Sequence, residues 1–222
     1  MVRIPLRRNL RPINFEYLDE TVAQYYRPIQ GYFMRKRLDL ALQHIHKYFE
    51  NTPPKSVLDV GYGGGTFILN LAGISNDVHG IDLHDKISVV NEILGLEGVT
   101  ASLVKGNILE MPYDTSSFDL VTCISVLEHF KNQQLKQAMA EILRVLRPGG
   151  VAVVGFPTKN IVSNFIIKYI LGFNPDEIHP SGHYEISTSV SKSTGQIEHT
   201  TIYPNLPLDV ALYVVITITK EK

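Results

Sequence analysis

The chain has 222 residues, of which 44% are hydrophobic and 19% charged, and its 21 basic side chains nearly balance 22 acidic ones. This composition is typical of a globular protein. It excludes a disordered or collagen-like chain and argues against a surface built to bind nucleic acid. The longest apolar stretch, 161–173, is well short of the roughly 20 residues that span a bilayer. We therefore expect no transmembrane segment. Because the single cysteine, Cys123, cannot form an intramolecular disulfide, we also expect a cytoplasmic protein.

The N-terminal part of the chain is expected to differ from the rest. Residues 1–33 are predicted to form a tail and cap, since Pro5, Pro12 and Pro28 interrupt any long helix there. Apolar residues then recur at a spacing of three to four, which predicts a helix over 34–49 with one buried face. Residues 34–222 are predicted to form one domain.

Short apolar runs rich in β-branched residues alternate with helical stretches after this helix. Strands are predicted at 56–60, 78–81, 100–104, 118–124 and 151–156, and helices at 66–72, 86–94, 131–146 and 160–171. Nearly continuous apolar strands separated by helices indicate parallel strands that are buried on both faces. Two further strands, at 196–203 and 211–219, are joined by too short a connection to cross a sheet, so they should pair antiparallel. The predicted fold is α/β: a doubly wound, Rossmann-like sheet of seven strands with a C-terminal antiparallel hairpin.

A glycine-rich turn follows the first predicted strand. Gly61, Gly63 and Gly65 alternate there, and Asp59 stands two positions before the first of them. Glycines at a strand-to-helix turn permit positive φ angles and remove the Cβ atoms that would keep a ligand from the backbone. A dinucleotide fingerprint would need glycine where Thr66 stands, and no Gly-Lys-Ser/Thr of a P-loop follows. The turn therefore predicts a bound ligand, fits a dinucleotide only imperfectly and does not fit the phosphate loop of a nucleoside triphosphatase.

These four residues resemble the signature of the class I S-adenosylmethionine-dependent methyltransferases, which has an acidic residue and alternating glycines at the end of strand one. Glu128-His129 and the Leu-Arg-Pro-Gly-Gly run at 146–150 resemble the type 11, quinone-biosynthesis-like branch of that family. The resemblance is close over 34–156 and loose elsewhere. It implies S-adenosylmethionine as cofactor and S-adenosylhomocysteine as product, with the glycine turn against the methionyl part and Asp59 helping to hold its ammonium group.

Further cofactor contacts are expected where later strands end. Asp82 ends the second strand, where the family has the acid that binds ribose hydroxyls. Asn107 follows the third strand, where the family commonly has an aspartate that contacts adenine, so the chain departs from the pattern there. Leu83 and Ile108 could give apolar contacts to adenine, and Ser125 lies at the edge expected to border the cleft. The alternatives are a turn or helix cap for Asp82, a plain turn residue for Asn107, and core positions for Leu83 and Ile108.

Two histidines are candidate catalytic residues. Methyl transfer from a sulfonium requires a positioned acceptor atom and, for a hydroxyl, a base that removes its proton. His129 is the first candidate, and His183, in the segment 179–185, is the second. The alternatives are that Glu128-His129 braces a strand-to-helix junction and that 179–185 is a polar surface loop. Pro180 and Gly182 argue against a helix that would align histidines as metal ligands, so no metal is expected.

We therefore expect an enzyme, an S-adenosylmethionine-dependent methyltransferase acting on a small-molecule, glycan or lipid-linked acceptor, on oxygen rather than on carbon or nitrogen. One alternative is a catalytically silent S-adenosylmethionine-binding protein on the same fold, with a regulatory or complex-forming role. A nicotinamide-dependent oxidoreductase is the other. No nucleic-acid partner is expected, and the sequence leaves the oligomeric state open.

Overall fold

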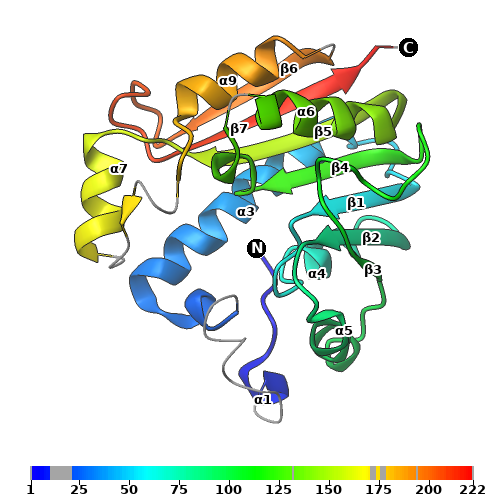
Figure 1. Ribbon diagram of the computed structural model, residues 1–222. Coiled ribbons are helices and arrows are strands. Elements are labelled where there is room, and N and C mark those ends of the chain that lie inside the picture. Colours follow the sequence, from blue (N-terminus) through cyan, green and yellow to red (C-terminus); the bar gives the residue numbers. More distant parts are fainter. Residues whose placement is uncertain are drawn as a thin grey trace. The chain divides into compact units, whose positions relative to one another are not determined.

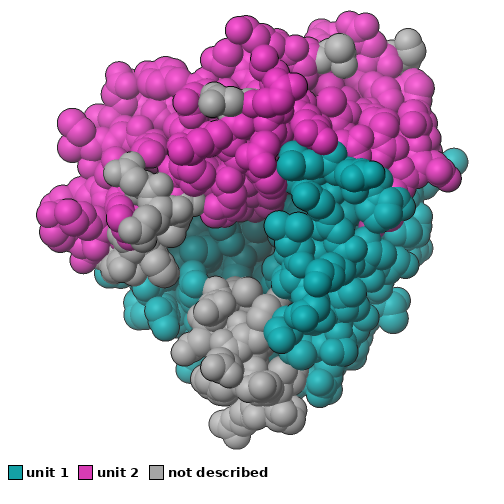
Figure 2. All heavy atoms as spheres, in the orientation of Figure 1, with its two compact units in different colours: residues 1–112 teal, residues 113–222 magenta. Residues whose placement is uncertain are grey.

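The computed structural model describes residues 2–10, 22–131, 133–170, 174–175, 179–193 and 195–221 (Figure 1). The chain divides into two compact units, residues 1–112 and 113–222, which are coloured separately in Figure 2. We refer to them as unit 1 and unit 2. The division predicted from the sequence, with a cap over 1–33 and one domain over 34–222, stays a prediction.

Seven strands lie within the described residues. Unit 1 has the order β3-β2-β1, and these strands are β1 (Ser56–Val60), β2 (Asp77–Asp82) and β3 (Ser102–Lys105). Unit 2 has the order β4-β5-β7-β6, and these are β4 (Phe118–Ile124), β5 (Leu146–Pro157), β6 (Gly195–Tyr203) and β7 (Tyr213–Lys220). The first three pair parallel, as do β4 and β5, whereas β7 runs antiparallel to β5 and β6. The predicted seven-stranded α/β fold with a C-terminal antiparallel hairpin is confirmed.

Helices connect these strands in both units (Figure 1). In unit 1 they are α1 (Arg7–Leu10), the 3-10 helix η1 (Ala23–Tyr26), α3 (Pro28–Tyr48), α4 (Ile68–Leu71) and α5 (Ile87–Leu96). In unit 2 they are the 3-10 helix η2 (Leu127–His129), α6 (Gln133–Val145), α7 (Ile161–Phe165), the π-helical turn η3 (Ile166–Ile170) and α9 (His183–Ser191). Helices α6 and α9 pack against each other and against β5 and β6 respectively. Within the described ranges, no helix is long and apolar enough to span a bilayer.

Prolines and glycines account for the main differences from the predicted boundaries. Helix α3 begins at Pro28 rather than at residue 34. The N–H of the first helical residue has no partner within the helix, so a proline, which has no N–H, is tolerated there. Strand β5 begins at Leu146, so Pro148 and Gly149 lie inside a strand rather than in the turn expected after the helix. The pairing of β5 with β4 shifts register there, and a shift of this kind accommodates a residue without an N–H.

The segment 179–185 is the other difference. Its described residues do not form an exposed loop, because α9 begins at His183 and the side chain of His183 is only 2% exposed. Gly182 precedes the helix in an extended conformation and donates its N–H to Glu185 Oε2 at 3.1 Å. Pro180 and Gly182 therefore stand before the helix, where they do not interrupt it.

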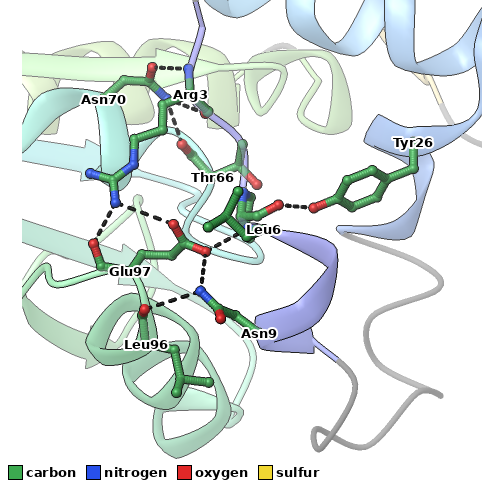
Figure 3. Close-up of polar contacts among 9 residues, drawn as sticks. Arg3, Leu6, Asn9, Tyr26, Thr66, Asn70, Leu96 and Glu97 are labelled. Atoms are coloured by element: carbon green, nitrogen blue, oxygen red, sulfur yellow. Dashed lines mark hydrogen bonds and ion pairs between the residues drawn. The ribbon is translucent and has the colours of Figure 1, made fainter.

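The start of the chain is tied to unit 1 by a set of polar contacts (Figure 3). Arg3 N–H donates to Asn70 Oδ1 at 2.8 Å, and Asn70 Nδ2 donates back to the Arg3 carbonyl at 2.9 Å. The carboxylate of Glu97, whose side chain is 3% exposed, accepts from Leu6 N–H at 2.6 Å and from Asn9 Nδ2 at 2.8 Å. Burial opposes ionisation of Glu97, but these hydrogen bonds outweigh it and lower its pKa. Residues 2–10 are thus a fixed part of unit 1.

Candidate active site

The glycine turn of unit 1 connects β1 to α4 in a conformation that favours glycine. Gly61, Gly63 and Gly65 have φ angles of 77°, 50° and 75°, which all lie in the left-handed region. Gly61 N–H donates to the Ile81 carbonyl on β2 at 2.8 Å, and Gly65 N–H donates to the Tyr62 carbonyl at 2.8 Å. The turn therefore leaves the sheet in a fixed direction, and its alternating glycines follow from the backbone geometry.

The glycines of this turn differ in what surrounds them. A Cβ atom at Gly65 would lie 2.8 Å from Val90 Cγ1, so this glycine allows α5 to pack closely against the turn. A Cβ atom at Gly63 would have no atom of the described residues within 4 Å. Gly63 therefore borders open space, and a ligand can approach its main chain there.

Two acidic residues flank this turn. Asp59 lies in β1 and is 2% exposed, opposite Gly80 of β2. Asp82 ends β2, with its side chain 18% exposed, and its Oδ2 accepts the Gly63 N–H at 2.8 Å. Its other oxygen, Oδ1, accepts the His84 N–H at 3.3 Å. A carboxylate has about four acceptor positions, so Asp82 keeps capacity for the hydroxyls of a ligand.

The remaining cofactor candidates of unit 1 have different environments. Leu83 is 61% exposed, which suits an apolar contact with a ligand, whereas Ile108 is 5% exposed. Asn107 Oδ1 accepts the Leu109 N–H at 3.0 Å, so this side chain already closes a local turn. Asn107 thus acts as a turn residue, which was the alternative to a contact with adenine. Its amide is exposed, so donor and acceptor positions remain open to a ligand.

Ser125 lies in unit 2, directly after β4, in an unusual conformation. Its φ angle of 59° is uncommon for a residue with a side chain, and backbone strain of this kind occurs most often at functional sites. Its N–H donates to the Gly155 carbonyl on β5 at 2.7 Å, and its Oγ lies 2.8 Å from the hydroxyl of Tyr213 on β7. The Ser125–Tyr213 pair thus marks the carboxyl end of β4.

Three histidines of unit 2 are candidate groups, and we call His129, His179 and His183 together the histidine cluster. His183 is connected to His179 through Lys159, whose N–H donates to His183 Nδ1 and whose Nζ donates to the His179 carbonyl. The ring centroids of His129 and His179 are 6.2 Å apart. Burial, and then the neighbouring His129 and Lys159, lower the pKa of His179 from 6.5 to about 4. Ser181 holds this segment against the turn after β4, because its N–H donates to the Glu128 carbonyl at 3.2 Å. His179 is therefore neutral at pH 7.

His183 has a defined tautomer. Its Nδ1 accepts the Lys159 N–H at 2.9 Å, so the proton of the neutral ring is on Nε2. The Nε2 atom is buried and has no hydrogen-bond partner among the described residues. Burial also lowers the pKa of His183. His183 is thus built as a hydrogen-bond donor rather than as a base.

Comparison with known proteins finds methyltransferases among those similar to this chain. The family model described as "Methyltransferase domain" matches residues 58–154. The chain is 27% identical over 164 residues to the ubiquinone biosynthesis O-methyltransferase of Rickettsia felis, a match that covers 68% of this chain and 66% of that protein. It is 28% identical over 195 residues to the protein of the same name in Rickettsia akari, covering 82% and 68%. The chain spans about two thirds of the length of these relatives. These matches support an S-adenosylmethionine-dependent methyltransferase, with the matched domain over residues 58–154.

Solved structures agree on the fold of this methyltransferase. The N-methyltransferase NodS from Bradyrhizobium japonicum, in complex with S-adenosylhomocysteine, superposes with a TM-score of 0.65 at 16% identity, covering 97% of this chain and 96% of that one. The PH0226 protein from Pyrococcus horikoshii gives a TM-score of 0.68 at 18% identity, covering 85% and 91%. The cofactor of this methyltransferase is S-adenosylmethionine, and the open space at Gly63 beside the Asp82 carboxylate fits an adenosyl compound.

The structure adds three residues that the sequence did not indicate. His84 contacts the main chain of the glycine turn, Lys159 contacts two members of the histidine cluster, and Tyr213 pairs with Ser125. Among the described residues, no group of three metal-ligating side chains forms. The candidate groups are thus the glycine turn with Asp82 in unit 1 and, separately, the Ser125–Tyr213 pair and the histidine cluster in unit 2.

Proposed function

We propose that this methyltransferase transfers the methyl group of S-adenosylmethionine to a hydroxyl oxygen of a small molecule. Its curated relatives are named O-methyltransferases of ubiquinone biosynthesis, which favours oxygen over nitrogen or carbon and a small molecule over a glycan. The observation that carries the proposal is the proximity of the His129 and His179 rings, whose centroids are 6.2 Å apart, because hydroxyl methylation needs a base and an imidazole can act as one.

The residues of unit 1 hold the cofactor in this proposal. When bound, S-adenosylmethionine supplies a methyl group on a cationic sulfur, which an acceptor oxygen attacks in line. The glycine turn, Gly61 to Gly65, offers bare main chain to the methionyl part, and Asp59 provides negative charge near its ammonium group. Asp82 accepts hydrogen bonds from the ribose hydroxyls.

The neighbouring residues complete the proposed cofactor site. The exposed side chain of Leu83 and the buried side chain of Ile108 contact the adenine ring in this proposal. Asn107 contributes an amide at the adenine edge. In unit 2, Ser125 stays a candidate cofactor contact, and Tyr213 fixes the direction in which its hydroxyl points.

The histidine cluster acts on the acceptor. His129 takes the proton of the acceptor hydroxyl as the oxygen attacks the methyl group. His179 stays neutral because of its burial, so its own ring adds no positive charge beside His129. His183 donates its Nε2–H to an oxygen of the acceptor. The acceptor thereby supplies the hydrogen-bond partner that this buried N–H does not find among the described residues.

An acceptor screen tests the proposal. The purified chain is incubated with S-adenosylmethionine and a panel of phenols, catechols, amines and sugars, and products are detected by mass spectrometry. A methyl ether formed from one of the hydroxyl compounds is the expected result. Methylation of amines alone would contradict the choice of oxygen. Binding of S-adenosylhomocysteine without turnover on any acceptor would support the silent regulator instead, and binding of NAD would support the oxidoreductase.

A further inference from the structure

The glycine turn is held at both main-chain polar groups of one residue, Gly63. Gly63 donates its N–H to Asp82 Oδ2 at 2.8 Å, and its carbonyl oxygen lies 3.0 Å from His84 Nε2. Glycine samples both positive and negative φ angles freely, so without such contacts the turn would populate several conformations. The two contacts fix Gly63 at a φ of 50°, in the residue that borders the open space.

The protonation of His84 follows from its two hydrogen-bonding partners. Its Nδ1 accepts the Lys86 N–H at 3.1 Å, so in the neutral ring Nδ1 carries no proton. The proton is therefore on Nε2, where it is donated to the Gly63 carbonyl. Asp82 Oδ2 lies 3.7 Å from the same Nε2 atom, and the ring packs edge-on against Tyr62 at 4.9 Å between centroids. The imidazole is thus held in one orientation by its neighbours.

We infer that His84 is a positioning residue for the cofactor: its Nε2–H holds the Gly63 carbonyl and thereby keeps the glycine turn in the conformation that accepts the adenosyl compound. This inference rests on the proposed placement of the cofactor at Gly63 and Asp82. A turn that is already ordered before binding loses less conformational entropy when the ligand binds, so the contact raises affinity without touching the ligand. Asp82 has a direct role in this account, and His84 acts through Gly63.

Two conservative substitutions of His84 each keep the hydrogen bond of one ring nitrogen and remove that of the other. In His84→Gln the side-chain amide N–H2 reaches about as far as Nε2, so it can still donate to the Gly63 carbonyl. In His84→Asn the amide oxygen takes the place of Nδ1, so the contact with Lys86 N–H is kept and the donor to Gly63 is lost. The Lys86 N–H lies at an exposed position where water can replace an acceptor, so His84→Gln should be tolerated.

The experiment measures S-adenosylhomocysteine affinity by titration calorimetry, together with the melting temperature of each unliganded variant. His84→Asn should weaken binding about fivefold, the effect of one lost hydrogen bond, while His84→Gln stays within about twofold of the parent. His79→Asn is the matched control, since His79 lies in the same unit with a side chain 26% exposed, against 21% for His84, and should bind like the parent. A purely structural role would instead lower the melting temperature of both His84 variants and affect their binding equally.

An Asp82→Asn variant distinguishes failure of this inference from failure of the cofactor site. If Asp82→Asn binds S-adenosylhomocysteine as tightly as the parent, the placement of the cofactor is wrong and the role of His84 falls with it. If Asp82→Asn weakens binding and His84→Asn does not, only the role of His84 is overturned. Nitrogen-15 NMR of the imidazole rings gives an independent readout at neutral pH. A His84 ring protonated on Nε2 is expected, and one protonated on Nδ1 alone would overturn the inference.

Discussion

The glycine turn of unit 1 and the histidine cluster of unit 2 are held together in different ways. The turn is fixed by its own main-chain hydrogen bonds and by the side chain of Asp82 at the end of β2, and its three positive φ angles select glycine. The histidine cluster brings together His129 and His179, which are far apart in the sequence, through a backbone contact of Ser181 and the contacts of Lys159. The first region depends on the backbone conformation of neighbouring residues, and the second depends on contacts between segments distant in sequence.

The glycine turn should change less under selection than the histidine cluster. A glycine turn tolerates few replacements, because a side chain there strains the backbone or blocks the ligand. A side-chain cluster at the carboxyl end of β4 and β5 can be replaced while the sheet stays intact. Cofactor binding should therefore be the conserved property of this fold, and acceptor choice the variable one.

The largest expected effect tests the histidine cluster. His129→Ala should lower the turnover number about 100-fold with the acceptor found in the screen, because a general base contributes at least that factor. His199→Ala, which removes a partly exposed histidine of β6 in the same unit, serves as the control and should retain full turnover. Steady-state kinetics at saturating cofactor measure both. Equal turnover of His129→Ala and the parent would remove His129 from the mechanism.

The pH dependence of stability tests the burial of the same cluster. His179 has a pKa of about 4 in the folded chain against 6.5 for an ordinary histidine, so the unfolded chain binds the proton more readily between these values. Stability due to this group is therefore complete above pH 6.5 and is lost as the pH falls towards 4. His179 should make the free energy of unfolding in urea about 2 kcal/mol lower at pH 5 than at pH 7. The variant His179→Gln should lack this contribution to the pH dependence. An unchanged pH dependence in His179→Gln would contradict the burial of this imidazole.

Two glycine substitutions sharpen the contrast within unit 1. Gly63→Ala should weaken binding of S-adenosylhomocysteine about 5- to 30-fold, because a side chain in the left-handed region costs about 1–2 kcal/mol, and fluorescence-monitored unfolding should show a comparable loss of stability. Gly65→Ala should destabilise the fold more, since its Cβ atom would also collide with Val90. Equal unfolding free energies for the two variants would contradict this assignment of roles.

The smallest expected effect concerns Asn107. Replacing it by aspartate would restore the acid that the family commonly has at this place, while the turn contact to the Leu109 N–H can be kept. The affinity for S-adenosylmethionine should rise by about threefold, the effect of making one exposed hydrogen bond charge-assisted. Calorimetry on the Asn107→Asp variant measures it. A loss of affinity would show that an amide at this position suits the ligand better than a carboxylate.

Much of the fold could be predicted from the sequence because buried parallel strands are short, apolar and bounded by turns. β1 and β4 have the predicted bounds, and the antiparallel pairing of β6 and β7 follows from their short connection. Prolines and glycines caused the errors, since Pro28 begins a helix and Pro148 lies within a strand. The same residue can end one element or begin the next, and only the tertiary contacts decide which.

The candidate site was predictable where backbone geometry selects the residue. The glycines of the turn leave a signal in the sequence because other residues rarely adopt their φ angles. His84 left no such signal, because it acts through contacts with the main chain of Gly63 and Lys86. Tyr213 could not be paired with Ser125, since 88 residues separate them and the pair exists only when β7 lies beside β5.

The most direct test of the account is a crystal structure of the chain with S-adenosylhomocysteine. The methionyl part should lie against the main chain of Gly61 to Gly65, and both ribose hydroxyls should lie within hydrogen-bond distance of the Asp82 carboxylate. An adenosyl group bound elsewhere, or a ribose without contact to Asp82, would contradict the central claim that the glycine turn and the end of β2 form the cofactor site.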